Sequence, residues 1–254
     1  MEIVVLGSGT STGVPVIGCE CEVCRSTHPK NKRTRPSLLL RAGERAVLID
    51  AGPDFRQQAL REGLWHLDAV VLTHAHADHL LGLDDLRVFN FRQQAPLPLY
   101  GSPATLATVQ QMFAYAFEAP SEGSSIPQFV LHPIEGPFTV AGLPFLPLPV
   151  WHGEMEVLAF RVYDFAYVTD VSLIPARVVD QLKGLDLLIL DALRYRPHPT
   201  HFSLTEALEV VATLRPRCTY LTHLTHHFDH ETVNAQLPSG VKLAYDGLRL
   251  EIPS

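Results

Sequence analysis

Four side chains that can bind metal ions stand within six residues, directly after a short apolar run. The stretch "VVLTHAHADH" is typical of a buried strand that breaks into a turn carrying His74, His76, Asp78 and His79. Residues two apart on an extended segment point the same way, so the first two histidines can chelate one ion. The other two residues begin the next helix and face a neighbouring ion. A lone histidine is usually a satisfied core residue, but this ordered set of four predicts a metal site.

A second cluster of candidate ligands lies near the N-terminus. The stretch "GCECEVC" places Cys19, Cys21 and Cys24 within six residues, whereas Cys218 stands far away. This is no disulfide framework, and close spacing of thiols indicates a metal. Three thiolates can take three corners of a zinc tetrahedron, and a closed site of this kind is structural because no position is open to substrate. The spacing leaves the fourth ligand open among His28, Cys218, His226, His227 and His230.

The composition is that of an ordinary globular protein. With 254 residues, 46% of them hydrophobic, the chain can bury a sizeable core. The formal net charge of −7 argues against generic binding to nucleic acid or to anionic membranes. No stretch approaches the roughly 18 apolar residues of a spanning helix, and the first apolar run is too short for a signal peptide. We therefore expect a cytoplasmic protein without a membrane partner.

Two local patterns invite a phosphate-binding interpretation that the sequence does not decide. The basic stretch "HPKNKRTR", residues 28–35, is expected to be a solvated loop, although Arg33 and Arg35 could contact phosphate. Arg194 and Arg196 allow the same two interpretations. The stretch "GSGTSTG" lacks both the Gly-Lys-Ser/Thr ending of a nucleotide loop and the G-x-G-x-x-G pattern, so it predicts a tight turn.

Periodicity predicts a layered α/β arrangement. Short apolar runs that end in turns predict strands, several joined as hairpins, within residues 3–7, 37–52, 67–74, 97–101, 145–152, 158–170, 185–192, 219–223 and 241–252. Helices are expected over residues 54–62, 102–118 and 203–214. The last of these starts with Ser203 and Glu206, which are spaced as a capping box. Strand-rich segments with intervening helices indicate sheets covered by helices.

The order His-x-His-x-Asp-His resembles the defining motif of the metallo-β-lactamase-fold hydrolases, and the resemblance extends over nearly the whole chain. It implies a single domain over residues 1–254, folded as a four-layer αββα sandwich with a dinuclear metal site at one edge between the sheets. Three further ligands are implied, each after an apolar run: His152, Asp170 and His223. For Asp50, in "VLIDAG", the resemblance implies that it orients the metal loop rather than binding metal.

Within these hydrolases the chain is most similar to the PhnP-type phosphodiesterases, through the segment "GVPVIGCECEVC". This resemblance implies that His201, in "RPHPTHFSLTEA", is a general acid. It also implies that His226 completes a structural zinc site with the three cysteines, in a loop at about residues 18–35. His226 stands three residues after His223, so the zinc would tie the N-terminal loop to that ligand. A homodimer is possible by the same resemblance.

The resulting hypothesis is a hydrolase with two divalent metal ions, Mn or Zn. One ligand set is His74, His76, His152 and Asp170, and the other is Asp78, His79, Asp170 and His223. Ions roughly 3.5–4 Å apart would hold a bridging hydroxide that attacks phosphorus. His201 would protonate the leaving oxygen, and Asp78 is counted with it as catalytic. The expected substrate is a small, cyclic or simple phosphodiester such as a ribosyl 1,2-cyclic phosphate or a 2′,3′-cyclic nucleotide.

Three other functions are weaker. A transfer-RNA 3′-processing endonuclease of the same superfamily would share the metal motif, but the chain has an acidic net charge and no long basic insertion for clamping RNA. A non-catalytic metal-binding or redox module would leave the ordered set of seven ligands unexplained. A thioesterase of the glyoxalase II kind is chemically possible, but it explains no part of the cysteine segment.

Overall fold

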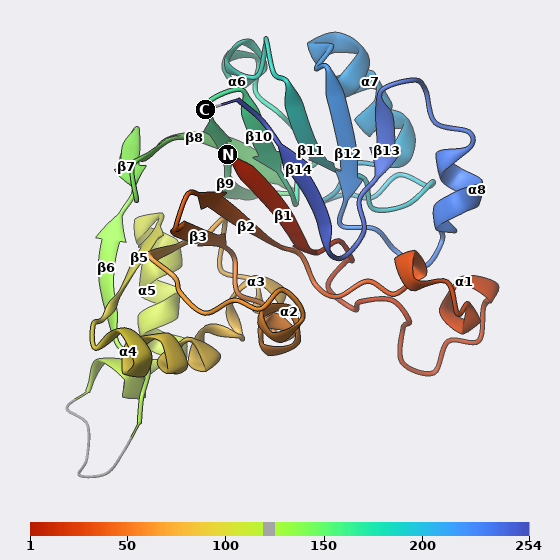
Figure 1. The fold of residues 1–254 in the computed structure, drawn as a ribbon. Coiled ribbons are helices and arrows are strands. Elements are labelled where there is room, and N and C mark those ends of the chain that lie inside the picture. The colour runs from red at the N-terminus through yellow and green to blue at the C-terminus, as the bar shows by residue number, and fades with distance from the viewer. Residues whose placement is uncertain (119–124, 254) are drawn as a thin grey trace.

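The computed structural model describes residues 1–118 and 125–253, which contain two seven-stranded sheets packed face to face (Figure 1). The first sheet has the order β14-β1-β2-β3-β4-β5-β6. Its strands are β1 (Glu2–Gly7), β2 (Ser37–Ala42), β3 (Arg45–Ile49), β4 (Ala69–Val71), β5 (Leu97–Gly101), β6 (Phe129–Pro133) and β14 (Leu248–Glu251). The pairs from β3 to β6 are parallel and the pairs among β14, β1, β2 and β3 are antiparallel.

The second sheet has the order β13-β12-β11-β10-β9-β8-β7. Its strands are β7 (Phe138–Val140), β8 (Leu143–His152), β9 (Met155–Val162), β10 (Phe165–Val168), β11 (Leu187–Asp191), β12 (Cys218–Thr222) and β13 (Val241–Leu243). The pairs from β10 to β13 are parallel, and the pairs from β7 to β10 are antiparallel. Each sheet therefore has one parallel half, whose strands end at a common edge.

Helices cover the outer face of each sheet. The first sheet carries α2 (Phe55–Arg61), α3 (Ala77–Leu80), α4 (Arg87–Gln93) and α5 (Pro103–Met112), and the second carries α6 (Ala176–Gln181), α7 (Leu204–Leu214) and α8 (His230–Asn234). A short helix, α1 (Glu22–Arg25), lies in the cysteine segment, and 3₁₀ turns occupy Pro29–Asn31, Leu83–Leu86 and Ala114–Phe117. Within residues 1–118 and 125–253, no helix combines the length and apolarity needed to cross a bilayer.

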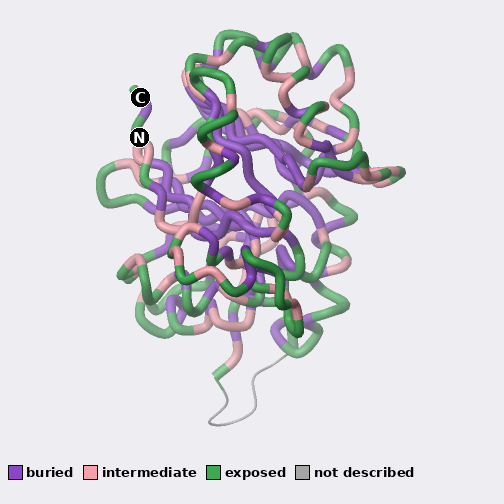
Figure 2. The backbone as a smooth tube through the Cα atoms, turned by 90° about the vertical axis from the view of Figure 1, so that its right-hand side faces the viewer, coloured by how far each residue is buried: buried purple, intermediate pink, exposed green. Residues whose placement is uncertain are grey.

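Three apolar layers hold the sheets and helices together. The central layer interleaves side chains from both sheets, among them Leu38, Val47, Phe145 and Phe160. The two outer layers join each sheet to its helices. Figure 2 shows the buried residues concentrated along the strands, with exposed residues at the periphery. The four-layer αββα sandwich implied by the sequence resemblance is confirmed.

Most predicted elements are present, and the exceptions have local causes. Ser203 caps α7 through both bonds of the predicted capping box. The helix expected over residues 102–118 is α5 followed by a 3₁₀ turn. The run 241–252 gives one strand to each sheet, β13 and β14. We did not predict β6 and β7, because β6 is partly exposed on both faces and β7 has only three residues, so neither has a clear apolar pattern.

The candidate ligands stand where strands of the two parallel halves end. His74 lies three residues after β4, Asp170 two residues after β10, and His223 directly after β12. His152 is the last residue of the long strand β8. Because the carboxyl ends of parallel strands meet at one edge, this topology gathers residues from far apart in the chain.

Asp246, between β13 and β14, joins the end of the chain to two N-terminal segments. Its carboxylate accepts hydrogen bonds from the backbone N–H groups of Ser8 (2.9 Å) and Thr34 (2.8 Å) and from both of their hydroxyl groups. The backbone oxygen of Ser8 in turn accepts from the N–H of Leu224, the residue after His223. Asp246 therefore holds together the segments at Ser8 and Thr34, and through Ser8 it supports the residue that follows the candidate ligand His223.

We predict that Asp246→Ala lowers the free energy of unfolding by about 3 kcal/mol, because two backbone N–H groups lose their acceptor. Urea denaturation would measure the change. Asp180→Ala is the matched control, because it removes an exposed carboxylate that pairs with Lys183, and its effect should stay below about 0.5 kcal/mol. Equal effects of the two substitutions would contradict the anchoring role of Asp246.

Candidate metal centre

One group of potential ligands gathers four side chains from three segments. Ligand atoms of His74, His76, His152 and Asp170 all lie within 4.8 Å of one another. Nε2 of His74 and Nδ1 of His76 are only 2.9 Å apart. The four side chains are buried except His76, which is exposed and stands at the N-cap of α3. The group therefore opens toward solvent on one side, where a substrate could enter.

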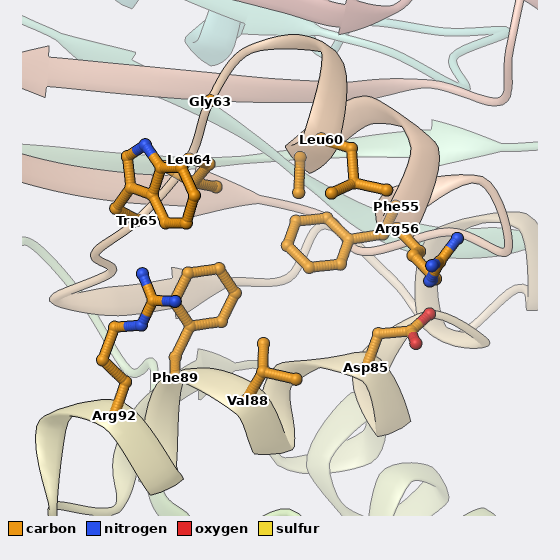
Figure 3. Close-up of a pocket in the computed structure, with 11 residues that line it drawn as sticks. Phe55, Arg56, Leu60, Gly63, Leu64, Trp65, Asp85, Val88, Phe89 and Arg92 are labelled. Atoms are coloured by element: carbon orange, nitrogen blue, oxygen red, sulfur yellow. The ribbon is translucent and has the colours of Figure 1, made fainter.

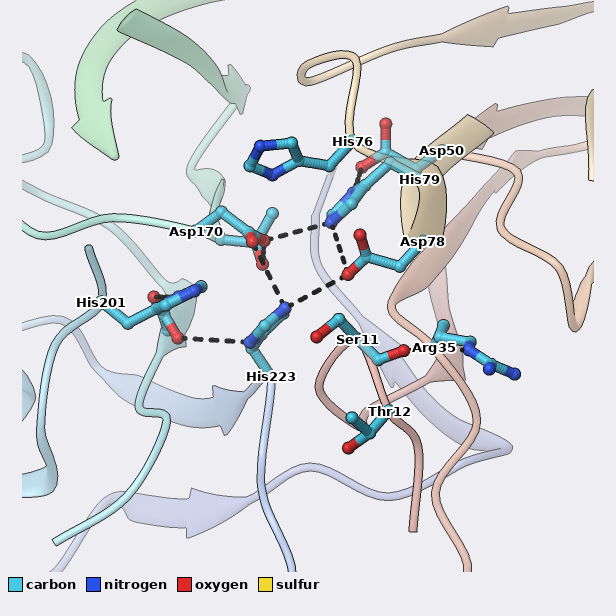
Figure 4. Close-up of polar contacts among 12 residues, drawn as sticks. Ser11, Thr12, Arg35, Asp50, His76, Asp78, His79, Asp170, His201 and His223 are labelled. Carbon is cyan, nitrogen blue, oxygen red and sulfur yellow. Dashed lines mark hydrogen bonds and ion pairs between the residues drawn. The ribbon is translucent and has the colours of Figure 1, made fainter. Parts of the chain in front are cut away.

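A second group shares Asp170 with the first. Ligand atoms of Asp78, His79, Asp170 and His223 also lie within 4.8 Å of one another, and all four residues are buried. Nε2 of His79 is 3.3 Å from one Asp170 oxygen, and Nε2 of His223 is 3.3 Å from the other. Asp78 lies within 3.7 Å of both imidazoles. Figure 4 shows these side chains converging on one point between the two sheets. The geometry brings together all seven predicted ligands.

The second group fits a divalent metal ion by its unsatisfied atoms. Nε2 of His79 and Nε2 of His223 are buried without a hydrogen-bond partner, although each faces carboxylate oxygens. Buried polar atoms are rarely left unpaired, and a cation between them would satisfy them. Imidazole and carboxylate donors suit Zn or Mn. Metal ligation by each of the seven residues is our prediction.

The charges of the second group also call for a cation. Burial raises the pKa of Asp170, but the positive charges of His223 and His79 outweigh burial and hold it well below its usual range. Burial lowers the pKa of His223, but Asp170 and Asp78 outweigh burial and raise it to about 9. Without metal, protonated imidazoles thus balance the carboxylates. Metal ions would replace those protons as the source of positive charge.

Surrounding groups fix the orientation of the imidazoles. Oδ2 of the buried Asp50 accepts from Nδ1 of His79 at 2.7 Å, and Asp50 also accepts from the N–H and the hydroxyl of Thr73 at 2.8 Å each. Nδ1 of His152 donates to the backbone oxygen of Thr200 at 2.7 Å. In both histidines Nε2 is left as the atom that faces the cluster, which is the usual arrangement around metal-binding imidazoles. Asp50 therefore lies where the predicted orienting role requires it.

Three residues of the centre adopt a backbone conformation that side chains other than glycine rarely take. The φ angles are 62° for Asp50, 53° for Asp170 and 59° for His223. Each of these residues follows a strand, and left-handed backbone turns the chain sharply there. Such strain persists only where surrounding contacts determine it, and it is common at functional sites.

A third group extends the second one toward the loop after β11. Nδ1 of His201 donates to Oδ2 of Asp191 at 2.8 Å, and the ring of His201 stacks on that of His223 with centroids 4.7 Å apart. The other oxygen of Asp191 is 4.0 Å from Nδ1 of His223. The ring of His201 also lies 4.5 Å from that of His152. The predicted acid, His201, therefore stands directly beside both groups of candidate ligands.

The three cysteines converge on the histidine that the resemblance implied. Nδ1 of His226 lies 3.2 Å from Sγ of Cys19, 3.6 Å from Sγ of Cys21 and 3.4 Å from Sγ of Cys24. A tetrahedral zinc ion with bonds of about 2.3 Å to sulfur and 2.0 Å to nitrogen would space such ligands about 3.5 Å apart. Two backbone N–H groups point at these sulfurs, which favours thiolate. The donor set fits a closed zinc site, and zinc binding is our prediction.

Arg33 ties the cysteine segment to the residues that follow His223. Its guanidinium is only 2% exposed and donates to the backbone oxygens of Thr225 (3.0 Å) and Phe228 (2.7 Å). Burial lowers the pKa of Arg33 to about 10, while Asp246 and Asp229 oppose the shift. The expectation of a solvated loop is wrong for Arg33, because the side chain turns inward to satisfy carbonyl groups.

The other arginines differ in how they are held. Arg35 forms an ion pair with Asp54 at 3.0 Å and donates to the backbone oxygen of Ser11, which lies close to the centre in Figure 4. Arg194 donates to the backbone oxygens of Arg196 and Pro197.

The comparison with protein families decides where the chain belongs. A family described as the β-lactamase superfamily domain matches residues 45–224, which is more than half of the chain. The chain belongs to this superfamily. The matched segment contains all seven candidate ligands together with Asp50, Asp191 and His201. The cysteine segment lies outside it.

A solved structure described as a new diphosphatase from the PhnP family is similar over nearly its whole length. It has a TM-score of 0.93 and 45% identity, covering 98% of this chain and 96% of the other. The similarity to PhnP-type enzymes expected from the sequence is confirmed. Together with the superfamily match, this similarity supports the metal-dependent hydrolase that we propose below.

Two further comparisons set limits. An octanoyltransferase of Porphyromonas gingivalis is 40% identical over 98% of this chain, but the chain spans about half of that protein (51%). The zinc-bound PqqB of Methylobacterium extorquens has a TM-score of 0.78 at 22% identity, covering 99% of this chain and 100% of the other, a likeness that concerns the fold alone. The choice between Zn and Mn in this chain, and the number of ions, belong to the proposals below.

Sequence reasoning missed Asp191, Thr73 and Thr200. Asp191 ends the buried run "LDLLILDA", and an ionisable residue at the end of a buried strand in a superfamily whose sites lie at strand ends was a usable signal. Thr73 and Thr200 act through a hydroxyl and a backbone oxygen, which no motif reveals. Of the five candidates for the fourth zinc ligand, His226 is the one that joins the three cysteines in a ligand group of the described residues, and His28, Cys218, His227 and His230 do not.

We predict that each chain holds one zinc ion that survives mild chelation and that His226→Ala loses it. The reason is that three cysteines without a fourth donor bind zinc weakly. Metal analysis after gel filtration would measure zinc per chain, and thermal unfolding would report the loss of stability. His227→Ala is the matched control, because the exposed neighbouring imidazole contacts only Thr225 among the hydrogen bonds of the described residues. Unchanged zinc in His226→Ala would show that another group is the fourth ligand.

Proposed function

We propose that this chain is a metal-dependent phosphodiesterase that hydrolyses a small, cyclic or simple phosphodiester, such as a ribosyl 1,2-cyclic phosphate or a 2′,3′-cyclic nucleotide. The observation that carries the proposal is the His201–Asp191 pair beside two groups of metal ligands. Phosphodiester hydrolysis needs both charge neutralisation at the phosphoryl oxygens and a proton for the leaving alkoxide. This site offers side chains for each requirement.

The candidate ligands form two sets that differ in their number of carboxylates. His74, His76 and His152 give one site a neutral imidazole set, while Asp78, His79 and His223 give the other a mixed set, and Asp170 serves both. Two bound divalent ions, Zn or Mn, would supply Lewis acidity and an activated water for attack at phosphorus. A third ion, zinc, would hold the Cys19–Cys24 loop against the segment that carries His223.

His201 supplies the proton. Because Nδ1 donates to Asp191 at 2.8 Å, Nε2 is the nitrogen that can hold a proton toward the cluster. The buried Asp191 carboxylate accepts from Nδ1 and so orients the His201 ring with Nε2 toward the cluster. As the P–O bond breaks, the proton of Nε2 passes to the leaving oxygen, which departs as an alcohol, and a proton from solvent then restores His201. In this reaction His201 touches the substrate, whereas Asp191 positions His201.

The relatives support a reaction at phosphorus. A diphosphatase cleaves a phosphoanhydride, which shares with a phosphodiester the displacement of an oxygen from phosphorus. The octanoyltransferase name points instead to acyl transfer, but about half of that relative has no counterpart in this chain. Transfer-RNA processing stays the alternative, and the net charge of −7 disfavours a long polyanion as substrate.

A panel of substrates tests the proposal. The metal-loaded protein is assayed on a ribosyl 1,2-cyclic phosphate, a 2′,3′-cyclic nucleotide, a nucleoside diphosphate sugar, a precursor transfer RNA and an octanoyl thioester. The proposal is supported if the cyclic diesters are turned over at least about tenfold faster than each of the other substrates. Selective cleavage of the transfer RNA or of the thioester would overturn it.

We predict that His201→Ala lowers kcat on a diester with an alkoxide leaving group by roughly 10²–10⁴-fold, since that leaving group needs a proton. On a p-nitrophenyl diester, whose leaving group departs unprotonated, the loss should be less than about tenfold. Steady-state assays with both substrates measure the contrast, and metal content should stay unchanged. His198→Ala, in the same loop, is the control. An undiminished rate with the alkoxide substrate would refute the role of His201.

Asp191→Asn should lower kcat on the alkoxide substrate by about tenfold or more with little change in KM, because His201 loses the partner that orients it. A merely structural loss would lower the rates on both classes of leaving group alike. Asp191→Glu should recover part of the rate, because the carboxylate is retained. If Asp191→Asn lowers kcat equally on both substrates, or if the variant loses metal, Asp191 does not act through His201.

A further inference from the structure

An apolar groove lies on the outer helical layer of the first sheet, away from the metal ligands. Its walls are α2 with the following turn on one side and the Leu83–Leu86 turn with α4 on the other (Figure 3). The cavity has a volume of about 320 Å³. None of the residues that line it belongs to the metal groups, so this inference does not depend on the proposed function.

The groove exposes large apolar side chains at its rim. Phe55 and Phe89 form a buried floor that packs into the core of this layer. Leu60, Trp65 and Val88, at the rim, are between 59% and 67% exposed. Single exposed apolar side chains are ordinary, but a concave cluster of them indicates a binding site.

The two ends of the groove differ in charge. At one end Arg56 and Asp85 face each other across the walls, while at the other end Arg92 lies over the ring of Trp65 (Figure 3). The guanidinium carbon of Arg92 is 4.7 Å from the centroid of Trp65. Among the described residues, Arg92 makes neither an ion pair nor a side-chain hydrogen bond, so its charge is available to an anion. The groove therefore suits a ligand with an apolar chain and one anionic end.

We propose that this α2–α4 groove binds a medium-length fatty acyl carboxylate, with the hydrocarbon chain between Leu60, Phe89 and Val88 and the carboxylate on Arg92. A groove of about 320 Å³ has room for a hydrocarbon chain of medium length, such as that of octanoate. A planar guanidinium fixed over an aromatic ring can take a carboxylate through two N–H groups.

Trp65 provides a direct readout of binding. The chain has two tryptophans, so a Trp151→Phe background leaves Trp65 as the single reporter. Octanoate is titrated below its micellar concentration and the emission of Trp65 is followed. We expect a saturable change, with dissociation constants that tighten about fourfold for each methylene added from butanoate to octanoate. A change that is linear in concentration, or equal for all chain lengths, would overturn the proposal.

Two matched substitutions separate the contribution of the carboxylate to binding from that of the hydrocarbon chain. Arg92→Gln should weaken octanoate about tenfold and leave neutral octan-1-ol unaffected, because only the carboxylate uses the guanidinium. Arg56→Gln, at the end where Asp85 lies, should change neither ligand by more than about twofold. Val88→Asp should weaken both ligands, and circular dichroism checks that each variant is folded. Equal effects of Arg92→Gln and Arg56→Gln on octanoate would overturn the assignment of the carboxylate to Arg92.

Light scattering over a range of protein concentrations measures the mass of the particle and so tests whether a second copy of the chain covers the groove. The proposal requires octanoate to bind without changing the mass of the particle. A dimer that dissociates in Val88→Asp, together with loss of the octanoate response in the dimer, would show that a second copy of the chain covers the groove, and the fatty acyl proposal would then be wrong.

Discussion

The arrangement of the molecule depends on burying a carboxylate, Asp170, between two clusters of imidazoles. A buried charge is costly unless it is paired, and Asp170 is paired on both sides. Its oxygens face His79 and His223 from opposite sheets, so the two sheets meet through this residue. The same balance holds with protons on the imidazoles or with metal ions between them.

Gathering these side chains at one edge requires both sheet topology and local strain. The parallel halves bring the ends of β4, β10, β11 and β12 to the same side of the molecule. At Asp50, Asp170 and His223 the backbone then turns through a left-handed conformation. Hydrogen bonds to Thr73, Thr169 and neighbouring strands hold these turns. The strain is thus localised where the ligands need to leave the planes of the sheets.

The sequence predicted those parts of the site whose residues lie close together along the chain. The spacing of the residues from His74 to His79, and that of the three cysteines, predicts metal binding directly. His152, Asp170 and His223 were predicted from their positions at strand ends, after the resemblance had supplied the order of the ligands. The layered fold followed from alternating apolar runs. Arg33 was misjudged because a charged residue in a polar stretch looks solvated until tertiary packing gives it buried carbonyl groups as partners. Asp191 was overlooked because its role depends on the imidazole of His201, which reaches it from a loop. The partners of Arg33 lie 192 and 195 residues further along the chain, whereas His201 follows Asp191 by ten residues.

The segment from His223 to Phe228 shows how separate stabilising contacts converge on one ligand. Leu224 pairs with Ser8, Thr225 with Leu193, and Arg33 spans the backbone oxygens of Thr225 and Phe228. His226 reaches the cysteines from the same segment, while Thr225 lies beside the loop that leads to His201. A shift of this segment would therefore displace His223 and the ring that stacks on it together. Since the N-terminal loop is bonded to the residue after His223, and since His226 faces the cysteines, the cysteine cluster is part of the framework that positions the candidate ligands.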